Sequence, residues 1–213
     1  MLVQLLMQGL WETLVMVFIS TAVALAVGTP LGVLLVVTSP GHLWPRRFFN
    51  QVLAGIINAG RSLPFIILMV AIIPFTRLVV GTSIGTAAAI VPLSVAAIPF
   101  VARLVESALA EVDRGVIEAA QAMGATPWQI IRQVLFPEAL PALLLGATIT
   151  AISLVGYSAM AGAIGGGGLG DLAIRYGYQR FQGDVMLATV LVLLALVQLM
   201  QSFGDWLARR VRH

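Results

Sequence analysis

The chain has 213 residues, 60% of them hydrophobic and only 10% charged, with a mean hydropathy of +1.01 and a net charge of +3. Soluble domains carry about a quarter charged residues, so this composition excludes a soluble globular domain and indicates a protein that crosses a membrane several times. The absence of cysteine excludes disulfides and thiolate chemistry.

All 12 basic residues are arginine, so the chain has no lysine. The usual nucleotide-binding loop needs a lysine on the phosphates of ATP, and this chain cannot form one. If ATP drives this protein, another polypeptide binds the ATP.

Five hydrophobic segments are about as long as the roughly 20 residues that cross a bilayer. In chain order they cover about residues 13–37, 51–75, 84–104, 140–160 and 184–203. Prolines and glycines inside them predict bent or closely packed helices. We expect an all-α polytopic membrane protein with five transmembrane helices, forming a single domain over residues 1–213.

The arginines are distributed unevenly between the two sides of such a protein. One side would hold eight: Arg46, Arg47, Arg103, Arg114, Arg132, Arg209, Arg210 and Arg212. The other would hold three: Arg77, Arg175 and Arg180. Because basic residues favour the cytoplasmic side, the pattern predicts an N-terminus outside and a C-terminus inside.

Residues 106–138 form the one long polar stretch that is patterned as folded helix. A first helix should run to about Met123 and end at Gly124, which suits the left-handed position after a helix. Thr126 and Gln129 form a capping box, with Pro127 at the first position of a second helix. One apolar face is expected on each helix: Val116, Ile117, Ala120 and Met123 on the first, Trp128, Ile131 and Leu135 on the second.

A helix–turn–helix of this kind can serve several purposes. A DNA-binding hairpin needs basic side chains for the phosphates, and here acidic residues outnumber basic ones, which argues against nucleic acid. Two interpretations remain: a hairpin that packs on its own protein, and a surface on which a second protein docks.

A resemblance bears on this choice. Glu118, Ala119 and Ala120, followed by Gly124 and then by residues 134–137, resemble the EAA loop in permease subunits of type I ABC importers. The resemblance implies a cytoplasmic loop that contacts an ATP-hydrolysing subunit through Glu118, Ala119, Ala120, Gly124, Ala125, Thr126 and Pro127. It implies a transport subunit rather than an enzyme, with ATP and Mg²⁺ on the partner chain and no cofactor or metal on this one.

Segments 61–68, 73–77, 80–85, 123–127 and 154–160 together resemble the methionine-uptake permeases of bacteria. That family implies a homodimer in the bacterial inner membrane with two cytoplasmic ATP-binding subunits and an external substrate-binding lipoprotein, importing L-methionine and D-methionine. A dimer also follows from size, because five helices can hardly enclose a path for an amino acid. The alternatives are a permease for another amino acid or small polar solute and an ion-coupled secondary transporter, although the latter lacks an acidic group at a span centre.

Four residues are candidates for the transport pathway. Arg61 is the one charge well inside a hydrophobic segment, and it either serves function or extends to the headgroups. Tyr157, Ser158 and Met160 lie at the outer end of the fourth segment, where Met160 either fills a pore or simply packs.

The glycine-rich stretch at 165–170 contains the spacing Gly-x-Gly-x-x-Gly, but no strand precedes it. We expect a flexible or tightly turned external loop within a polar segment at 161–183. Glu12, near the outer surface, is expected to be solvated.

Overall fold

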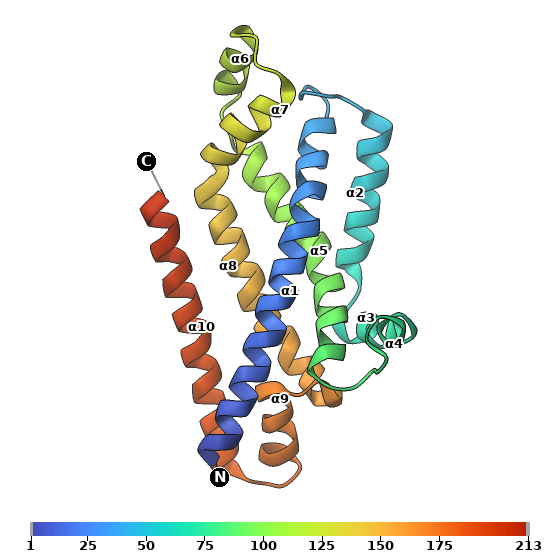
Figure 1. Ribbon diagram of the computed structural model, residues 1–213, viewed down its shortest axis with the longest axis vertical. Helices are drawn as coiled ribbons and strands as arrows, with labels where there is room; N and C mark the ends of the chain where they lie inside the picture. The colour runs from blue at the N-terminus through green and yellow to red at the C-terminus, as the bar shows by residue number, and fades with distance from the viewer. Residues whose placement is uncertain (1, 212–213) are drawn as a thin grey trace.

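Helices make up all of the regular structure that the computed structural model describes, which covers residues 2–211. Long, steep helices run side by side, and short helices lie at both ends of the bundle (Figure 1). An all-helical protein agrees with the sequence prediction.

Four long helical runs are long and apolar enough to cross a membrane. They are α1 (Leu2–Thr38), α5 (Thr86–Ala110), the continuous run Pro127–Gly166 and α10 (Gly183–Val211). A fifth crossing is obtained if α2 (Arg47–Ser62) and α3 (Phe65–Ala71) are counted together, although a bend of 101° separates them.

The second hydrophobic segment, predicted at residues 51–75, is therefore not one straight helix. The helix α2 ends where Leu63 turns to an extended conformation, as expected for a residue that precedes proline, and Pro64 then starts α3. The helix α4 (Ile73–Val80) follows and ends at Gly81, whose φ is 82°. Length and hydropathy alone could not separate these three pieces.

The first helix is longer than predicted. It begins at Leu2 rather than near residue 13, and its 37 residues correspond to about 55 Å at 1.5 Å per residue. Since the hydrocarbon core of a bilayer is about 30 Å thick, α1 is far longer than one perpendicular crossing needs.

The core lies where α1 crosses α5 and α8 (Phe136–Ala161), with buried side chains such as Met16, Leu93 and Leu154. Two glycines of α1 permit a close approach to α5. A Cβ on Gly32 would lie 2.6 Å from the carbonyl oxygen of Ala102, and one on Gly28 would lie 2.8 Å from Val101. Small residues at a crossing let two helix backbones approach closely, as is usual in membrane proteins.

The two ends of the bundle carry different elements (Figure 1). One end holds the loop between α1 and α2, the helices α6 (Arg114–Ala122) and α7 (Pro127–Ile130), and the C-terminal end of α10. The other end holds the N-terminus together with α9 (Gly168–Leu172) and the π-helix η3 (Ala173–Tyr178). Arg212, counted with the first end in the sequence, lies outside the described residues.

Candidate docking surface and transmembrane pathway

The helix α6 ends where local sequence signals predict, whereas its start at Arg114 was not predicted. The carboxylate of Asp113 accepts a hydrogen bond of 2.6 Å from the backbone N–H of Gly115 and so caps the N-terminus. At the other end Gly124 has a φ of 82°. Its N–H donates to the carbonyl of Gln121 at 2.9 Å, and the N–H of Ala125 donates to that of Ala120 at 3.1 Å. This pair of bonds is a Schellman motif, which confirms the predicted stop.

The second helix starts at the predicted capping box. The hydroxyl of Thr126 accepts from the N–H of Gln129 at 3.4 Å, while the side-chain oxygen of Gln129 accepts from the N–H of Thr126 at 2.8 Å. Pro127 occupies the first helical position. Together α6, the turn at Gly124 and α7 form a unit that we call the elbow, residues 114–130.

The second helix of the elbow continues beyond Ile130 into the fourth hydrophobic segment. The helix α7 continues through the π-helix η1 (Ile131–Leu135) into α8 and on to the π-helix η2 (Gly162–Gly166). The run from Pro127 to Gly166 is 40 residues long. The elbow and the far end of the bundle are thus joined by one helical run.

The predicted apolar faces of the elbow are only partly buried. Ile117, Ile131 and Leu135 are buried as expected. Val116, Met123 and Trp128 are instead exposed by 42%, 82% and 65%, so they do not share one buried face with these residues and leave apolar surface open. Large apolar side chains gathered on an exposed surface are typical of a site where another protein binds.

The residues assigned to partner contact by the resemblance fall into two groups. Glu118, Ala119, Gly124 and Thr126 are exposed, while Ala125 and Pro127 are half-buried. Ala120 is only 5% exposed and packs in the core of its own chain. Its small size is therefore explained by packing inside this chain, whereas Ala119 is open to a partner.

The loop between α1 and α2 lies against α6 of the elbow. A cavity of about 90 Å³ is lined by its residues Gly41, His42 and Leu43 and by Arg114, Ile117, Glu118 and Gln121 of α6. Burial lowers the pKa of the His42 imidazole, and the positive charge of Arg114 lowers it further. His42 thus faces the elbow. Among the described residues no group of three or more His, Cys, Asp or Glu could hold a metal ion.

The pathway candidates of α8 lie at the end of the bundle away from the elbow. The ring of Tyr157 stacks on Phe65 of α3, with 5.0 Å between centroids and 5° between planes. Met160 is 44% exposed. Ser158 is only 2% exposed, and its hydroxyl donates to the carbonyl of Val155 at 2.8 Å. Tyr157 and Met160 can therefore face a pathway, whereas the side chain of Ser158 packs inside the chain.

Arg61 lies in the last turn of α2 and is exposed. It borders a groove of about 370 Å³ on the surface of α5, with Phe100, Leu104 and Ser107 among the lining residues. Arg103 and Glu106, which also line it, form an ion pair of 2.5 Å, and Arg103 donates to Asn58 of α2 at 2.9 Å. A second arginine and an acid thus stand beside Arg61, which hydropathy did not indicate.

The glycine-rich stretch is helical and tightly packed, not a polar loop. It comprises η2, α9 and η3. Of the two predicted alternatives, a flexible loop and a tight turn, the structure shows the tight turn, with φ values near 80° at Gly167 and Gly168. A Cβ on Gly162 would lie 2.4 Å from the backbone nitrogen of Asp171, and one on Gly170 would lie 2.4 Å from the Cα of Ala159. Glycine is required here because backbone meets backbone.

Glu12 is not merely solvated. Its carboxylate accepts from the N–H of Gly168 at 2.7 Å, and the hydroxyl of the adjacent Thr13 accepts from the N–H of Leu169 at 2.9 Å. Thr13 is only 1% exposed. These two bonds, which we call the α1 clamp, hold the glycine-rich stretch against α1. No sequence signal joined residues that lie 156 positions apart.

The bundle and its exposed elbow define the class of protein. Residues 28–213 match the family described as binding-protein-dependent transport system inner membrane component. This match covers most of the chain, so the protein belongs to that family and is a component of the inner membrane.

Individual relatives are close in sequence and in structure. The chain is 59% identical over 209 residues to the probable D-methionine transport system permease protein MetI of Vibrio cholerae, covering 98% of this chain and 93% of the relative. It is 54% identical over 202 residues to the protein of the same description from Pasteurella multocida, covering 95% and 93%. A solved structure described as inward-facing conformations of the MetNI methionine ABC transporter is 53% identical, with a TM-score of 0.97 over 99% of this chain and 97% of that one.

Proposed function

We propose that the protein is the permease subunit of an ATP-driven ABC importer for methionine, in its L and D forms. The observation that carries the proposal is the elbow, which presents Glu118 and Ala119 on an exposed surface at one end of a membrane bundle. The names of the relatives support the choice of methionine. ATP and Mg²⁺ would belong to a partner subunit, because this chain has no lysine for a phosphate-binding loop.

The proposed topology has five crossings, with α2 and α3 counted as one, and forms one transmembrane domain over residues 1–213. The N-terminus would lie outside and the C-terminus inside. The distribution of arginine supports this orientation. The start of α6 and the last turn of α10, which carry Arg114 and Arg209, belong to the end of the bundle that holds the elbow, whereas η3, which carries Arg175, belongs to the other. The elbow, within the coupling loop 106–138, would then face the cytoplasm.

The proposed assembly is a homodimer with two cytoplasmic ATP-binding subunits and an external substrate-binding lipoprotein. Large apolar side chains are exposed along α2, α4 and α10, among them Phe48 at 81%, Leu78 at 84% and Leu199 at 69%. Such surfaces must be covered by lipid or by another chain. Ten helices around a two-fold axis can enclose a path that five cannot.

The continuous helical run gives the proposed mechanism its mechanical basis. The coupling residues would be Glu118, Ala119, Gly124, Ala125, Thr126 and Pro127, with Ala120 supporting them from inside. A displacement of the elbow by its partner would be transmitted through η1 and α8 to Tyr157 and Met160, which we propose as gate residues. Arg61 would line the pathway, because a charge at membrane depth is least costly where it meets water. Alternation between inward and outward states follows from tilting of such rigid elements.

The substitution Ala119→Trp tests this proposal. The side chain of Ala119 is exposed in the free chain, so tryptophan should leave the permease folded but hold the partner away. We expect loss of co-purification with the ATP-binding subunit and loss of ATP-dependent methionine uptake into proteoliposomes. The control is Gln179→Trp, at an exposed position of the other end, which should change neither. Normal uptake by Ala119→Trp would refute the coupling role of the elbow.

Substrate and energy source can be tested separately in the same proteoliposomes. Uptake that ignores ATP but collapses when ion gradients are dissipated would favour an ion-coupled transporter. ATP-dependent uptake of another amino acid, uninhibited by methionine, would retain the class of protein and overturn the substrate.

A further inference from the structure

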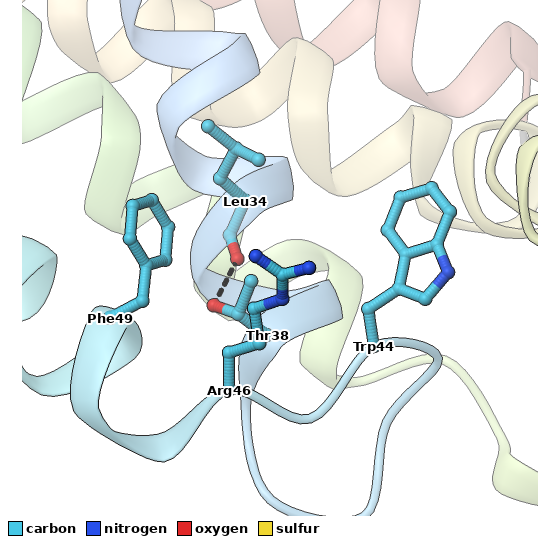
Figure 2. A pocket seen from close by; sticks show the side chains of 5 residues that line it. All are labelled: Leu34, Thr38, Trp44, Arg46 and Phe49. Atoms are coloured by element: carbon cyan, nitrogen blue, oxygen red, sulfur yellow. Dashed lines mark hydrogen bonds between the residues drawn. The ribbon is translucent and has the colours of Figure 1, made fainter.

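A pocket of about 370 Å³ lies beside the last turns of α1, at the end of the bundle that also holds the elbow. It is lined by Leu34, Thr38, Trp44, Arg46 and Phe49. In Figure 2 the indole of Trp44 and the ring of Phe49 stand on opposite sides of the helix end, with the guanidinium of Arg46 between them beside Thr38. The pocket thus offers one positive charge, the guanidinium of Arg46, surrounded by aromatic and aliphatic side chains.

The loop that carries Trp44 and Arg46 is tied to the end of α1. The N–H of Trp44 donates to the carbonyl of Val37 at 2.8 Å, and the N–H of Arg46 donates to that of Thr38 at 3.0 Å. The side-chain amide of Asn50 donates to the carbonyl of Leu35 at 2.7 Å. These bonds satisfy carbonyls that a helix end leaves without partners. The pocket therefore has its shape before any ligand enters.

Arg46 is the charged group of the pocket, and its guanidinium is free to bind a ligand. Among residues 2–211 the two ion pairs involve Arg103 and Arg175, so no carboxylate neutralises Arg46. The hydroxyl of Thr38 already donates to the carbonyl of Leu34 at 2.6 Å and accepts from Asn50 at 3.0 Å. A guanidinium donates two parallel hydrogen bonds to a phosphate group.

An apolar stripe leads from the pocket along α1. Val23, Val27, Pro30 and Leu34 are all exposed and recur at intervals of four, three and four residues, so they share one face of the helix. Leu34 belongs to both the stripe and the pocket. Trp44 and Phe49 beside it are of the residue types that gather at membrane interfaces.

We propose that this pocket binds the phosphate headgroup of an anionic phospholipid, with an acyl chain along the stripe of α1. One free guanidinium suits a phosphodiester, while a free phosphate ion would leave most of its oxygens facing apolar side chains. The stripe then accommodates the hydrocarbon that a free ion lacks. An anionic headgroup is favoured over a zwitterionic one because the positive charge of Arg46 has no counterion.

The test uses the full chain, purified with the subunits that accompany it, from bilayers with equal amounts of phosphatidylglycerol and phosphatidylcholine. Native mass spectrometry counts the lipids retained. We expect preferential retention of phosphatidylglycerol, reduced about five-fold by Arg46→Gln, since one arginine near the surface contributes about that factor. Arg46→Lys keeps the positive charge but loses the two parallel hydrogen bonds of the guanidinium, so it should reduce lipid retention less than Arg46→Gln does. Arg77→Gln, which removes an exposed arginine at the other end, is the matched control and should retain the wild-type preference.

Two further arms distinguish the source of the phosphate and the occupant. Inorganic phosphate added at millimolar concentration should not displace the retained lipid; displacement would show an anion site and overturn the proposal. A photoreactive benzoylphenylalanine in place of Leu34 should form adducts with lipid in membranes. Adducts with a second copy of the chain or with a partner subunit would also overturn it, as would unchanged retention in Arg46→Gln.

Discussion

Two regions interrupt the long helices of this protein, and they are built on different principles. The elbow is polar and exposed, and its turn is made by bonds between neighbours such as Gly124 and Gln121. The glycine-rich stretch is buried, and its shape depends on Ala159, Glu12 and Thr13. The elbow is stabilised by hydrogen bonds between residues close in sequence, and its surface is open to a partner. The glycine-rich stretch is held by tertiary contacts that leave no room for side chains at Gly162 and Gly170.

The largest effect is expected from Gly170→Ala in the glycine-rich stretch. The added Cβ would lie 2.4 Å from both the Cα and the carbonyl oxygen of Ala159, so two backbones must separate. We expect a loss of several kcal/mol of stability, beyond the usual overpacking cost of about 1–3 kcal/mol. The measurement is the thermal unfolding temperature in detergent, followed by fluorescence-detected size exclusion.

Gly156→Ala is the matched control for Gly170→Ala. Gly156 lies in α8, and a Cβ there meets nothing within 4 Å. Alanine should be neutral or stabilise the helix by up to about 1 kcal/mol. Equal behaviour of the two variants would contradict the assignment of close backbone contact to Gly170.

Thr13→Val tests the α1 clamp and should be next in size. The change keeps the shape of the side chain but removes the acceptor for the buried N–H of Leu169, which costs about 1–3 kcal/mol. Hydrogen exchange of residues 168–172 should accelerate. Thr21→Val is the control, because the hydroxyl oxygen of Thr21 is buried without a partner, and its removal should cost nothing. Slower or unchanged exchange in Thr13→Val would exclude the clamp.

Thr126→Ala tests the elbow and should be smaller in its effect on stability. Loss of the cap costs about 1 kcal/mol of helix stability. Since the cap is exposed, unfolding should remain local, and exchange of residues 128–130 should rise while the rest of the bundle stays protected. Thr126→Ser keeps the hydroxyl and should restore protection. A global loss of stability in Thr126→Ala would mean that the elbow is not locally determined.

The smallest expected effect is a dependence of the elbow on pH through His42. Burial and then Arg114 lower its pKa in the folded state below the ordinary value of 6.5, while Glu118 lines the same cavity. The folded protein thus binds fewer protons there than the unfolded chain, and stability is lost as the pH falls below 6.5 toward the lowered pKa. Hydrogen exchange of α6 should rise on acidification, and His42→Gln should remove this rise. A rise that persists in His42→Gln would assign it to another group.

The sequence by itself determined the membrane character of the chain, the end of α6 and the start of α7. Caps and the glycine stop act over a few residues, so Asp113, Gly124 and Thr126 specify their own geometry. It also singled out Tyr157 and Met160 as candidates for the pathway. It did not show that the ring of Phe65 stacks on Tyr157. The resemblance to the EAA loop could also be recognised from sequence alone, because Glu118 and Ala119 need only an exposed position on a short helix.

Tertiary structure alone decided the burial of Ala120 and Ser158 and the partner of Glu12. Each depends on how closely one helix backbone approaches another, which distant small residues such as Gly32 and Gly170 control. In a membrane, hydropathy marks helices that are apolar on every side and does not say which side is packed. Burial there follows from shape and from the need to pair backbone groups, and both are properties of the assembled bundle.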